Sequence, residues 1–159
     1  MEMAGRTHHL DFEPRVDVGH LLAGVAHAMI DLSDGLATDL RHICKASDVA
    51  ARLDVTRLPI SQAAQQLSGQ TGRLPWEHAL TDGEDYELCF TASADVDICQ
   101  RAGLSADAVR HIGEVIAGPV RLELIDEAGR TRPYEAHGWE HGGAGGRDEQ
   151  GLSGSATRD

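Results

Sequence analysis

The sequence predicts an α/β (α+β) layered sandwich, with helices packed on a mixed sheet of four to six strands. Two observations favour this fold class. Segments with helical character alternate along the chain with short segments typical of strands. The length of 159 residues also suits one domain with its own core. Apolar residues make up 41% of the chain but aromatic residues only 4%, so we expect a core of Leu, Val, Ile and Ala.

The expected elements follow from the spacing of apolar residues and from the turn residues between them. Ser61 is the expected N-cap of the third helix and Ser93 of the fifth, and residues 68–73 are expected to form a loop. The five helices are expected at 16–25, 36–46, 62–67, 75–80 and from 93 to about 102. The five strands are expected at 27–32, 50–55, 86–91, 109–116 and 120–125.

The two ends of the chain are expected to lack fixed structure. Residues 1–12 show no periodicity, and residues 142–159 are rich in Gly, Ser and charge with almost no apolar side chain. Such a segment buries too little apolar surface to offset its conformational entropy. One ordered domain is therefore expected over residues 13–141.

The composition restricts the partners. A formal net charge of −12 repels nucleic acids, and no Lys/Arg cluster offsets it. An acidic protein that handles phosphates usually needs a divalent metal ion as an intermediary. Because no apolar run approaches the roughly 18 residues of a membrane span and no signal-peptide core is recognisable, a soluble cytoplasmic protein is expected. Three scattered cysteines, Cys44, Cys89 and Cys99, are each expected to be buried free thiols.

The segment Asp31-Leu32-Ser33-Asp34-Gly35 places two carboxylates and a hydroxyl where an expected strand meets an expected helix. Strand ends in α/β folds open onto ligand sites, and helix N-termini present free N–H groups to anions. Asp31 and Asp34 could reach one Mg²⁺ ion, and Ser33 a phosphate oxygen. A structural alternative stays open, because Ser33 or Asp34 could simply be the N-cap of the helix.

A second acidic segment, at residues 82–88, precedes the third expected strand. Glu84 and Asp85 are expected in the loop, where a carboxylate could accept hydrogen bonds from an amino group or offset a cationic ring. The structural alternative is an acidic, solvated turn.

Taken together, the two segments resemble the signature motifs of the thiamine-monophosphate kinase family. The resemblance covers residues 29–43 and 83–91 most specifically, and shorter similarities extend it over about 13–141. It implies the C-terminal-domain fold of the aminoimidazole-ribonucleotide-synthetase superfamily. It also implies a reaction in which ATP, with Mg²⁺, donates its γ-phosphoryl group to thiamine monophosphate to give thiamine diphosphate.

Carried over by position, the resemblance makes Asp31 and Asp34 magnesium ligands, Ser33 an ATP contact, and Glu84 and Trp139 thiamine-monophosphate contacts. It implies no catalytic side chain in this chain, because such a transfer depends on positioning and charge neutralisation. An aromatic face suits a cationic thiazolium ring. The structural alternative for Trp139 is a surface aromatic that holds the last ordered segment.

The sequence departs from the family in two respects. The family commonly has glycine where this chain has Asp82, a residue that tolerates left-handed backbone. In addition, no segment corresponds to the family's amino-terminal domain, which supplies most metal-binding acids, much of the nucleotide site and the usual dimer interface. The expected partner is therefore a separate N-terminal kinase domain, and a homodimer is expected only for the full-length enzyme.

Three functions follow in order of preference. The first is the kinase C-terminal domain, inactive without its N-terminal domain. The second is a stand-alone, non-catalytic module that binds nucleotides or thiamine phosphates. The third is another enzyme of the superfamily, such as a selenophosphate synthetase or a hydrogenase-maturation protein, and the joint presence of the two long motifs argues against it.

Overall fold

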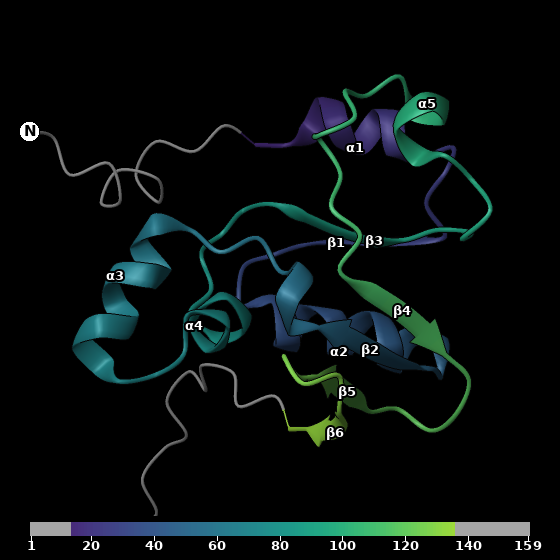
Figure 1. The fold of residues 1–159 in the computed structure, drawn as a ribbon. Coiled ribbons are helices and arrows are strands. Elements are labelled where there is room, and N and C mark those ends of the chain that lie inside the picture. The colour runs from purple at the N-terminus through teal and green to yellow at the C-terminus, as the bar shows by residue number, and fades with distance from the viewer. Residues whose placement is uncertain (1–13, 136–159) are drawn as a thin grey trace, which may run out of the picture.

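The computed structural model describes residues 14–135 (Figure 1). Its first half consists of α1 (Val16–Leu22), β1 (Ala28–Asp31), α2 (Leu36–Ser47), β2 (Ala50–Asp54), a 3₁₀ turn (Val55–Arg57), α3 (Gln62–Thr71) and α4 (Pro75–Thr81). Its second half consists of β3 (Leu88–Thr91), α5 (Ile98–Ala102), β4 (Gly113–Ile116), β5 (Leu122–Ile125) and β6 (Thr131–Tyr134).

The strands form two separate sheets. Four of them make a mixed sheet in the order β4-β2-β5-β6, in which β2 runs parallel to β5 and antiparallel to β4. The other two, β1 and β3, form an antiparallel pair. The expected mixed sheet with helices is therefore confirmed at four strands, and the strand that ends at Asp31 belongs to the smaller pair.

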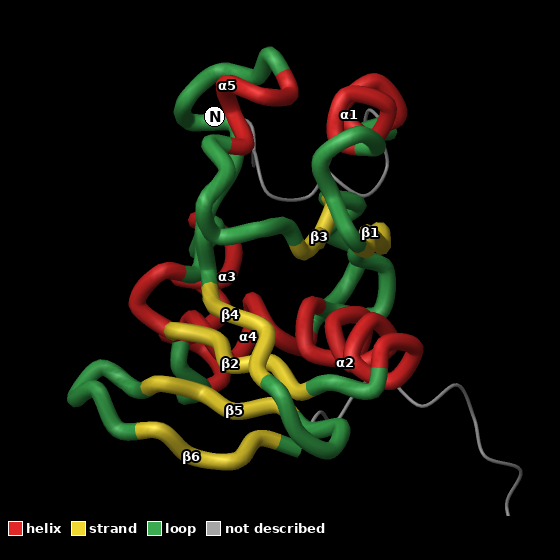
Figure 2. Tube along the Cα trace, turned by 90° about the vertical axis from the view of Figure 1, so that its right-hand side faces the viewer, coloured by secondary structure: helices red, strands yellow, loops and turns green. Residues whose placement is uncertain are grey.

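The helix α2 lies between the two sheets and contacts both of them (Figure 2). Its buried residues recur at three- and four-residue spacing and form one broad helix face. The helix covers the four-stranded sheet on one side and the β1–β3 pair on the other. These buried residues are Leu36, Ala37, Asp39, Leu40, Ile43 and Cys44. Because α2 joins the two layers, residues at its N-terminus lie close to both β1 and β3.

The four-stranded sheet buries one face and exposes the other. Leu53 and Leu124 are almost fully buried, as the alternation of residues along a strand requires. Arg52 lies opposite Glu114 and Glu123 in the neighbouring strands, and forms ion pairs with them at 3.0 and 2.8 Å. Cross-strand pairs of opposite charge stabilise a sheet face that is left in contact with water.

Three helices differ from the expectation at their ends, and the first of them, α1, ends at Leu22 instead of residue 25. The helix α3 continues to Thr71 through the expected loop, because the Thr71 hydroxyl bonds back to the Leu67 carbonyl and Gly72 ends the helix in left-handed backbone. The helix α5 begins only at Ile98, and Asp97 rather than Ser93 is its N-cap. The expected N-cap role of Ser61 is confirmed, since its side chain accepts a hydrogen bond from Ala64 N–H.

The strands β3 and β4 also begin later than expected, at Leu88 and Gly113, and β6 was not expected. Pro133 within β6 lacks an N–H, which an edge strand tolerates. Cys44 and Cys89 are buried as expected, whereas Cys99 is only half-buried. Among residues 14–135, no helix has the length and apolar character needed to cross a membrane.

Candidate functional site

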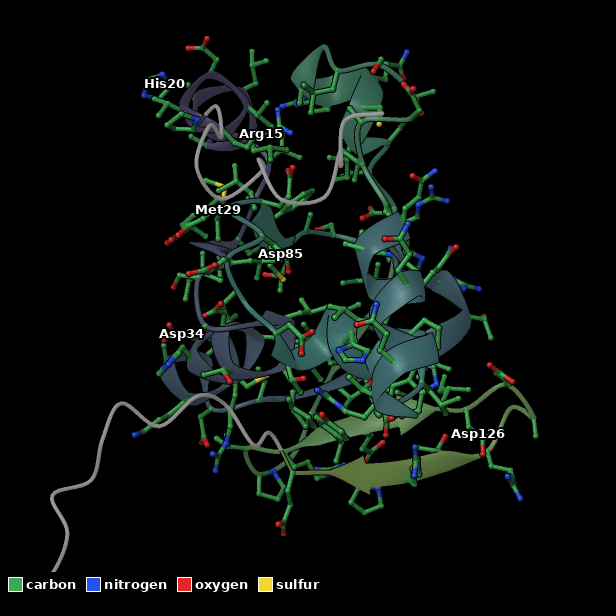
Figure 3. All side chains as sticks on the ribbon, turned by 90° about the vertical axis from the view of Figure 1, so that its left-hand side faces the viewer. Arg15, His20, Met29, Asp34, Asp85 and Asp126 are labelled. Atoms are coloured by element: carbon green, nitrogen blue, oxygen red, sulfur yellow. The ribbon has the colours of Figure 1, made fainter. Side chains whose placement is uncertain are left out.

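The first candidate segment lies at the junction of β1 and α2. Asp31 is the last residue of β1, where it pairs with Leu88 of β3. Asp31, Ser33 and Asp34 are all exposed, whereas Leu32 between them is buried. Figure 3 shows Asp34 at the surface beside α2. The segment therefore presents its two carboxylates and its hydroxyl to solvent on a turn that is anchored by one buried apolar side chain.

The turn is held by Asp39, a residue of α2 for which no role was expected from the sequence. The residue is 3% exposed, and its carboxylate accepts hydrogen bonds from the backbone N–H groups of Ser33, at 2.9 Å, and Asp34, at 3.1 Å. The N-cap of α2 is Gly35, without a side-chain cap. The alternative in which Ser33 or Asp34 caps the helix is therefore wrong, and the side chains of both residues are left for other contacts.

The buried position of Asp39 affects its acidity. Burial raises the pKa of Asp39 above its ordinary value, and the backbone hydrogen bonds from Asp34 and Ser33 act in the opposite direction. The neighbouring thiol of Cys89 is also buried, and its pKa is raised to about 11, first by burial and then by the charges of Asp39 and Cys44. Both shifts have the same first cause, which is the burial of these two groups.

The second candidate segment lies directly against the first. Glu84 N–H donates to the Ser33 carbonyl at 2.9 Å, and Tyr86 N–H donates to the Leu32 carbonyl at 2.9 Å. In the opposite direction, Leu32 N–H donates to the Glu87 carbonyl at 2.8 Å. Two segments that are far apart in the sequence thus form one site through backbone hydrogen bonds that continue the β1–β3 pairing.

Gly83 makes the close approach of the two segments possible. A Cβ atom at this position would lie 2.7 Å from the Ser33 carbonyl oxygen, and the backbone φ is +70°. Gly35 meets the end of α4 in a similar way, because a Cβ there would lie 3.0 Å from the Leu80 carbonyl oxygen at a φ of +103°. Both glycines therefore combine a left-handed backbone with a contact that excludes a side chain.

Two non-glycine residues of the second segment also have positive φ, Glu84 at +57° and Tyr86 at +51°. Such conformations cost about 1–2 kcal/mol each and persist only where the surroundings enforce them. Asp82, which stands where the family commonly has glycine, does not adopt left-handed backbone. Its φ is −76° and its ψ −20°, and Gly83 supplies the left-handed residue instead.

A network of side chains holds Asp82 in place. His78 Nδ1 lies 2.6 Å from Asp82 Oδ2, and Arg73 Nη1 donates to Asp82 Oδ1 at 3.2 Å. No role for His78 was expected from the sequence, because it forms no ligand-spaced pair with another histidine. Its spacing of four residues from Asp82 on a helix was the signal that could have identified it.

The residues present could bind a magnesium ion only together with substrate phosphates and water. Asp31 and Asp34 supply hard oxygen donors, and neither forms an ion pair within residues 14–135. Over this same range, no group of three or more His, Cys, Asp or Glu side chains is arranged to hold a metal. Because Mg²⁺ commonly binds through one or two carboxylates, waters and substrate phosphates, two exposed carboxylates suit a shared site rather than an all-protein one.

A cavity of about 360 Å³ lies outside the candidate site. None of Asp31, Ser33, Asp34 and Glu84 lines it. Arg15 and Glu87, which form an ion pair at 2.7 Å, contribute its charged lining. The apolar part of the lining is formed by Val18, Leu22, Leu88, Phe90, Ala108 and Val109. Trp139, the remaining candidate contact, lies outside the described residues.

The chain is similar to known proteins over most of its length. The family model described as "AIR synthase related protein, C-terminal domain" matches residues 8–125. Thiamine-monophosphate kinase from Escherichia coli K12 is 51% identical over 105 residues, which cover 66% of this chain and 30% of that protein. The matched part of the chain therefore spans less than a third of the length of this curated relative.

Solved structures give the same result. The crystal structure of thiamine-monophosphate kinase from Stenotrophomonas maltophilia matches with a TM-score of 0.58 and 40% identity, over 70% of this chain and 35% of that one. A structure described as "AaThiL complexed with AMPPCP and TMP" matches with a TM-score of 0.65 and 29% identity, over 85% of this chain and 40% of that one. These similarities confirm the resemblance indicated by the two sequence motifs.

Proposed function

Because the chain belongs to the AIR synthase related protein family, as a C-terminal domain, we propose that it functions as the C-terminal domain of a thiamine-monophosphate kinase. In the proposed reaction, ATP donates its γ-phosphoryl group to the phosphate of thiamine monophosphate, and the product is thiamine diphosphate. The identity of 51% to the Escherichia coli enzyme supports this assignment. So does the similarity to a protein whose structure was determined with AMPPCP and TMP.

The observation that carries the proposal is the direct contact between Ser33 and Glu84. The Glu84 N–H donates to the Ser33 carbonyl at 2.9 Å, and both side chains are exposed. In the proposed function Ser33 contacts ATP and Glu84 contacts thiamine monophosphate. Direct phosphoryl transfer requires the donor and the acceptor to lie next to each other, and this backbone contact supports such a placement.

Asp31 and Asp34 would hold Mg²⁺ together with phosphate oxygens and water. When bound, the ion would supply positive charge that offsets the charge of the transferred phosphoryl group. The protein's own contribution is to keep the two carboxylates on a rigid turn. Asp39 provides that rigidity, because its buried carboxylate accepts the N–H groups of Ser33 and Asp34.

Glu84 and Trp139 would bind the thiamine portion of the substrate. A carboxylate can offset the cationic thiazolium ring or accept hydrogen bonds from the aminopyrimidine, and an aromatic face favours a flat cation. The left-handed backbone of Glu84 supports this role, since strained conformations cluster at ligand sites.

We also propose that turnover requires an N-terminal kinase domain. The relatives are longer than the matched region, which makes up 30% of the Escherichia coli enzyme. A single Mg²⁺ ion held by Asp31 and Asp34 would also leave most of the phosphate charge without a counter-charge. A site that is divided between two domains loses contacts and preorganisation when only one is present. ATP, thiamine monophosphate and this domain are the proposed partners.

The test is thiamine diphosphate formation from ATP, Mg²⁺ and thiamine monophosphate. The chain is assayed alone and mixed with the separately expressed N-terminal domain of a relative. We expect activity only in the mixture and its loss in Asp31→Ala. The variant Asp95→Ala, at an exposed loop position, serves as the control and should retain activity.

Activity of the chain alone would contradict the requirement for the N-terminal domain. Absence of activity in both assays, combined with measurable binding of thiamine monophosphate or nucleotide, would favour the non-catalytic binding module.

A further inference from the structure

A buried histidine lies directly behind the loop that carries Glu84. His78 of α4 is 4% exposed, and both of its ring nitrogens have partners. Nδ1 lies 2.6 Å from Asp82 Oδ2, and Nε2 lies 2.9 Å from the Thr71 hydroxyl at the end of α3. Because an ionised carboxylate only accepts hydrogen bonds, Nδ1 carries the hydrogen that is shared with Asp82. The ring therefore links α3 and α4 to Asp82.

Asp82 is fixed from several directions, although it is half exposed. Besides His78, its second carboxylate oxygen accepts a hydrogen bond from Arg73 at 3.2 Å. Its backbone N–H donates to the His78 carbonyl at 3.0 Å, as the last bond of α4. Arg73 also donates to the Glu77 carbonyl and the Thr81 hydroxyl, which holds the end of the same helix. The position of Asp82, from which the next loop begins, is thus fixed.

The loop at residues 83–86 can keep its conformation only if the residue before it is fixed. Gly83 meets the Ser33 carbonyl so closely that no side chain fits, and Glu84 and Tyr86 adopt left-handed backbone. These conformations are unfavourable in isolation and persist only where both ends of the loop are constrained. The hydrogen bonds of Glu84 N–H and Tyr86 N–H to residues 32 and 33 constrain one side. The His78–Asp82 pair constrains the entry.

We propose that His78 is a positioning residue, which acts through Asp82 to hold Glu84 against Ser33. The ligand that benefits from this placement is the thiamine phosphate of the proposed function, on which that part of the inference rests. The positioning itself is a property of this chain, and it can be measured without turnover.

The test is amide hydrogen exchange of the chain, measured by NMR at neutral pH. In His78→Phe, a ring of similar size fills the buried space but bonds to neither Asp82 nor Thr71. We expect the amides of Glu84 and Tyr86 to exchange about tenfold faster than in the parent, as the loss of a charge-assisted hydrogen bond implies. The Ala51 amide, which donates to the Arg121 carbonyl at 3.1 Å in the larger sheet, should be unchanged.

Three further variants make the result specific. The Nδ2 atom of His78→Asn can replace Nδ1 as a donor to Asp82, so this variant should restore most of the protection. Asp82→Ala, at an exposed position where misfolding is not expected, should accelerate the same two amides. Asp97→Ala removes an acid that caps α5, away from this loop, and should leave both amides unchanged.

The inference is overturned if His78→Phe and Asp82→Ala leave the Glu84 and Tyr86 amides as protected as in the parent. It is overturned equally if both variants accelerate Ala51 to the same extent. In the mixed kinase assay, His78→Phe should raise the KM for thiamine monophosphate more than it lowers kcat. Lack of turnover in the parent would count against the proposed function, whereas the exchange result would still decide the role of His78.

Discussion

The carboxylate of Asp39 lies 2.9 Å from the backbone nitrogen of Ser33 and accepts its hydrogen, although the two residues belong to different elements. The same oxygen accepts the Asp34 N–H at 3.1 Å. A buried acid in the first turn of α2 therefore reaches back and fixes the turn before the helix. This contact leaves the side chains of Ser33 and Asp34 exposed, which a capping role for either residue would not do.

We predict that Asp39→Ala destabilises the protein by about 3 kcal/mol, because it removes the buried acceptor of two part-buried N–H groups, those of Ser33 and Asp34. Asp39→Asn keeps one oxygen acceptor and should cost less. Urea unfolding measures both changes, and the proposed Mg²⁺-dependent activity of the mixture should fall in Asp39→Ala.

Asp126→Ala is the matched control. Asp126 also accepts two backbone N–H groups, those of Ala128 and Arg130, but in a turn on the surface. Water can replace this acceptor, so we expect a smaller loss of stability. An equal loss in the two alanine variants would show that the burial of Asp39 has no special importance.

We predict that Gly83→Ala costs about 3 kcal/mol of unfolding free energy, because it combines left-handed backbone with a steric clash. The added Cβ would lie 2.7 Å from the Ser33 carbonyl oxygen at a φ of +70°. Gly72→Ala provides the control, since its φ is +74° but no atom lies within 4 Å of the added Cβ. It should cost about 1 kcal/mol. If the two variants unfold at the same urea concentration, the two segments do not pack as closely at Gly83 as described.

The cysteines should differ in reactivity. Burial raises the pKa of Cys89 to about 11 and also raises the pKa of Cys44, whereas Cys99 is only half-buried. We therefore expect one thiol to react rapidly with Ellman's reagent at pH 8 in the folded protein, and Cys99→Ser to abolish that phase. Rapid modification in the Cys99→Ser variant would contradict the buried positions of the other two thiols.

The buried thiol of Cys89 should also make the protein less stable at alkaline pH. Below pH 9 the folded and unfolded chains both keep the Cys89 proton. Between pH 9 and 11 the unfolded chain releases it while the folded protein retains it, so the folded state binds more protons and the free energy of unfolding falls. Across this window the contribution is about 3 kcal/mol.

Urea unfolding at several pH values measures this contribution. In Cys89→Ala the free energy of unfolding should fall less steeply between pH 9 and 11 than in the parent. Val55→Ala, which shortens another buried side chain that does not titrate, should lower stability without changing the slope. Equal slopes in the parent and in Cys89→Ala would count against this prediction.

Local sequence patterns were sufficient to predict the helix α2 and the strand β2. The helix α2 and the strand β2 lie within one residue of their expected limits, because a three-to-four residue period and a strict alternation are set by neighbouring side chains. The turn between β1 and α2 was equally clear, since Ser-Asp-Gly interrupts two periodic segments. Elements whose limits depend on distant partners were less predictable. The strand β6 contains Pro133 and exists because β5 offers it a free edge.

The sequence by itself therefore determined that a strand, a tight turn and a helix carry Asp31, Ser33 and Asp34, because these structures depend on short-range backbone preferences. Only the tertiary structure decided that Glu84 lies against Ser33 and that the Leu32 N–H meets the Glu87 carbonyl. Such contacts arise when separate elements pack around α2. Hydrogen bonds and burial between residues distant in the chain leave no periodic pattern in the sequence.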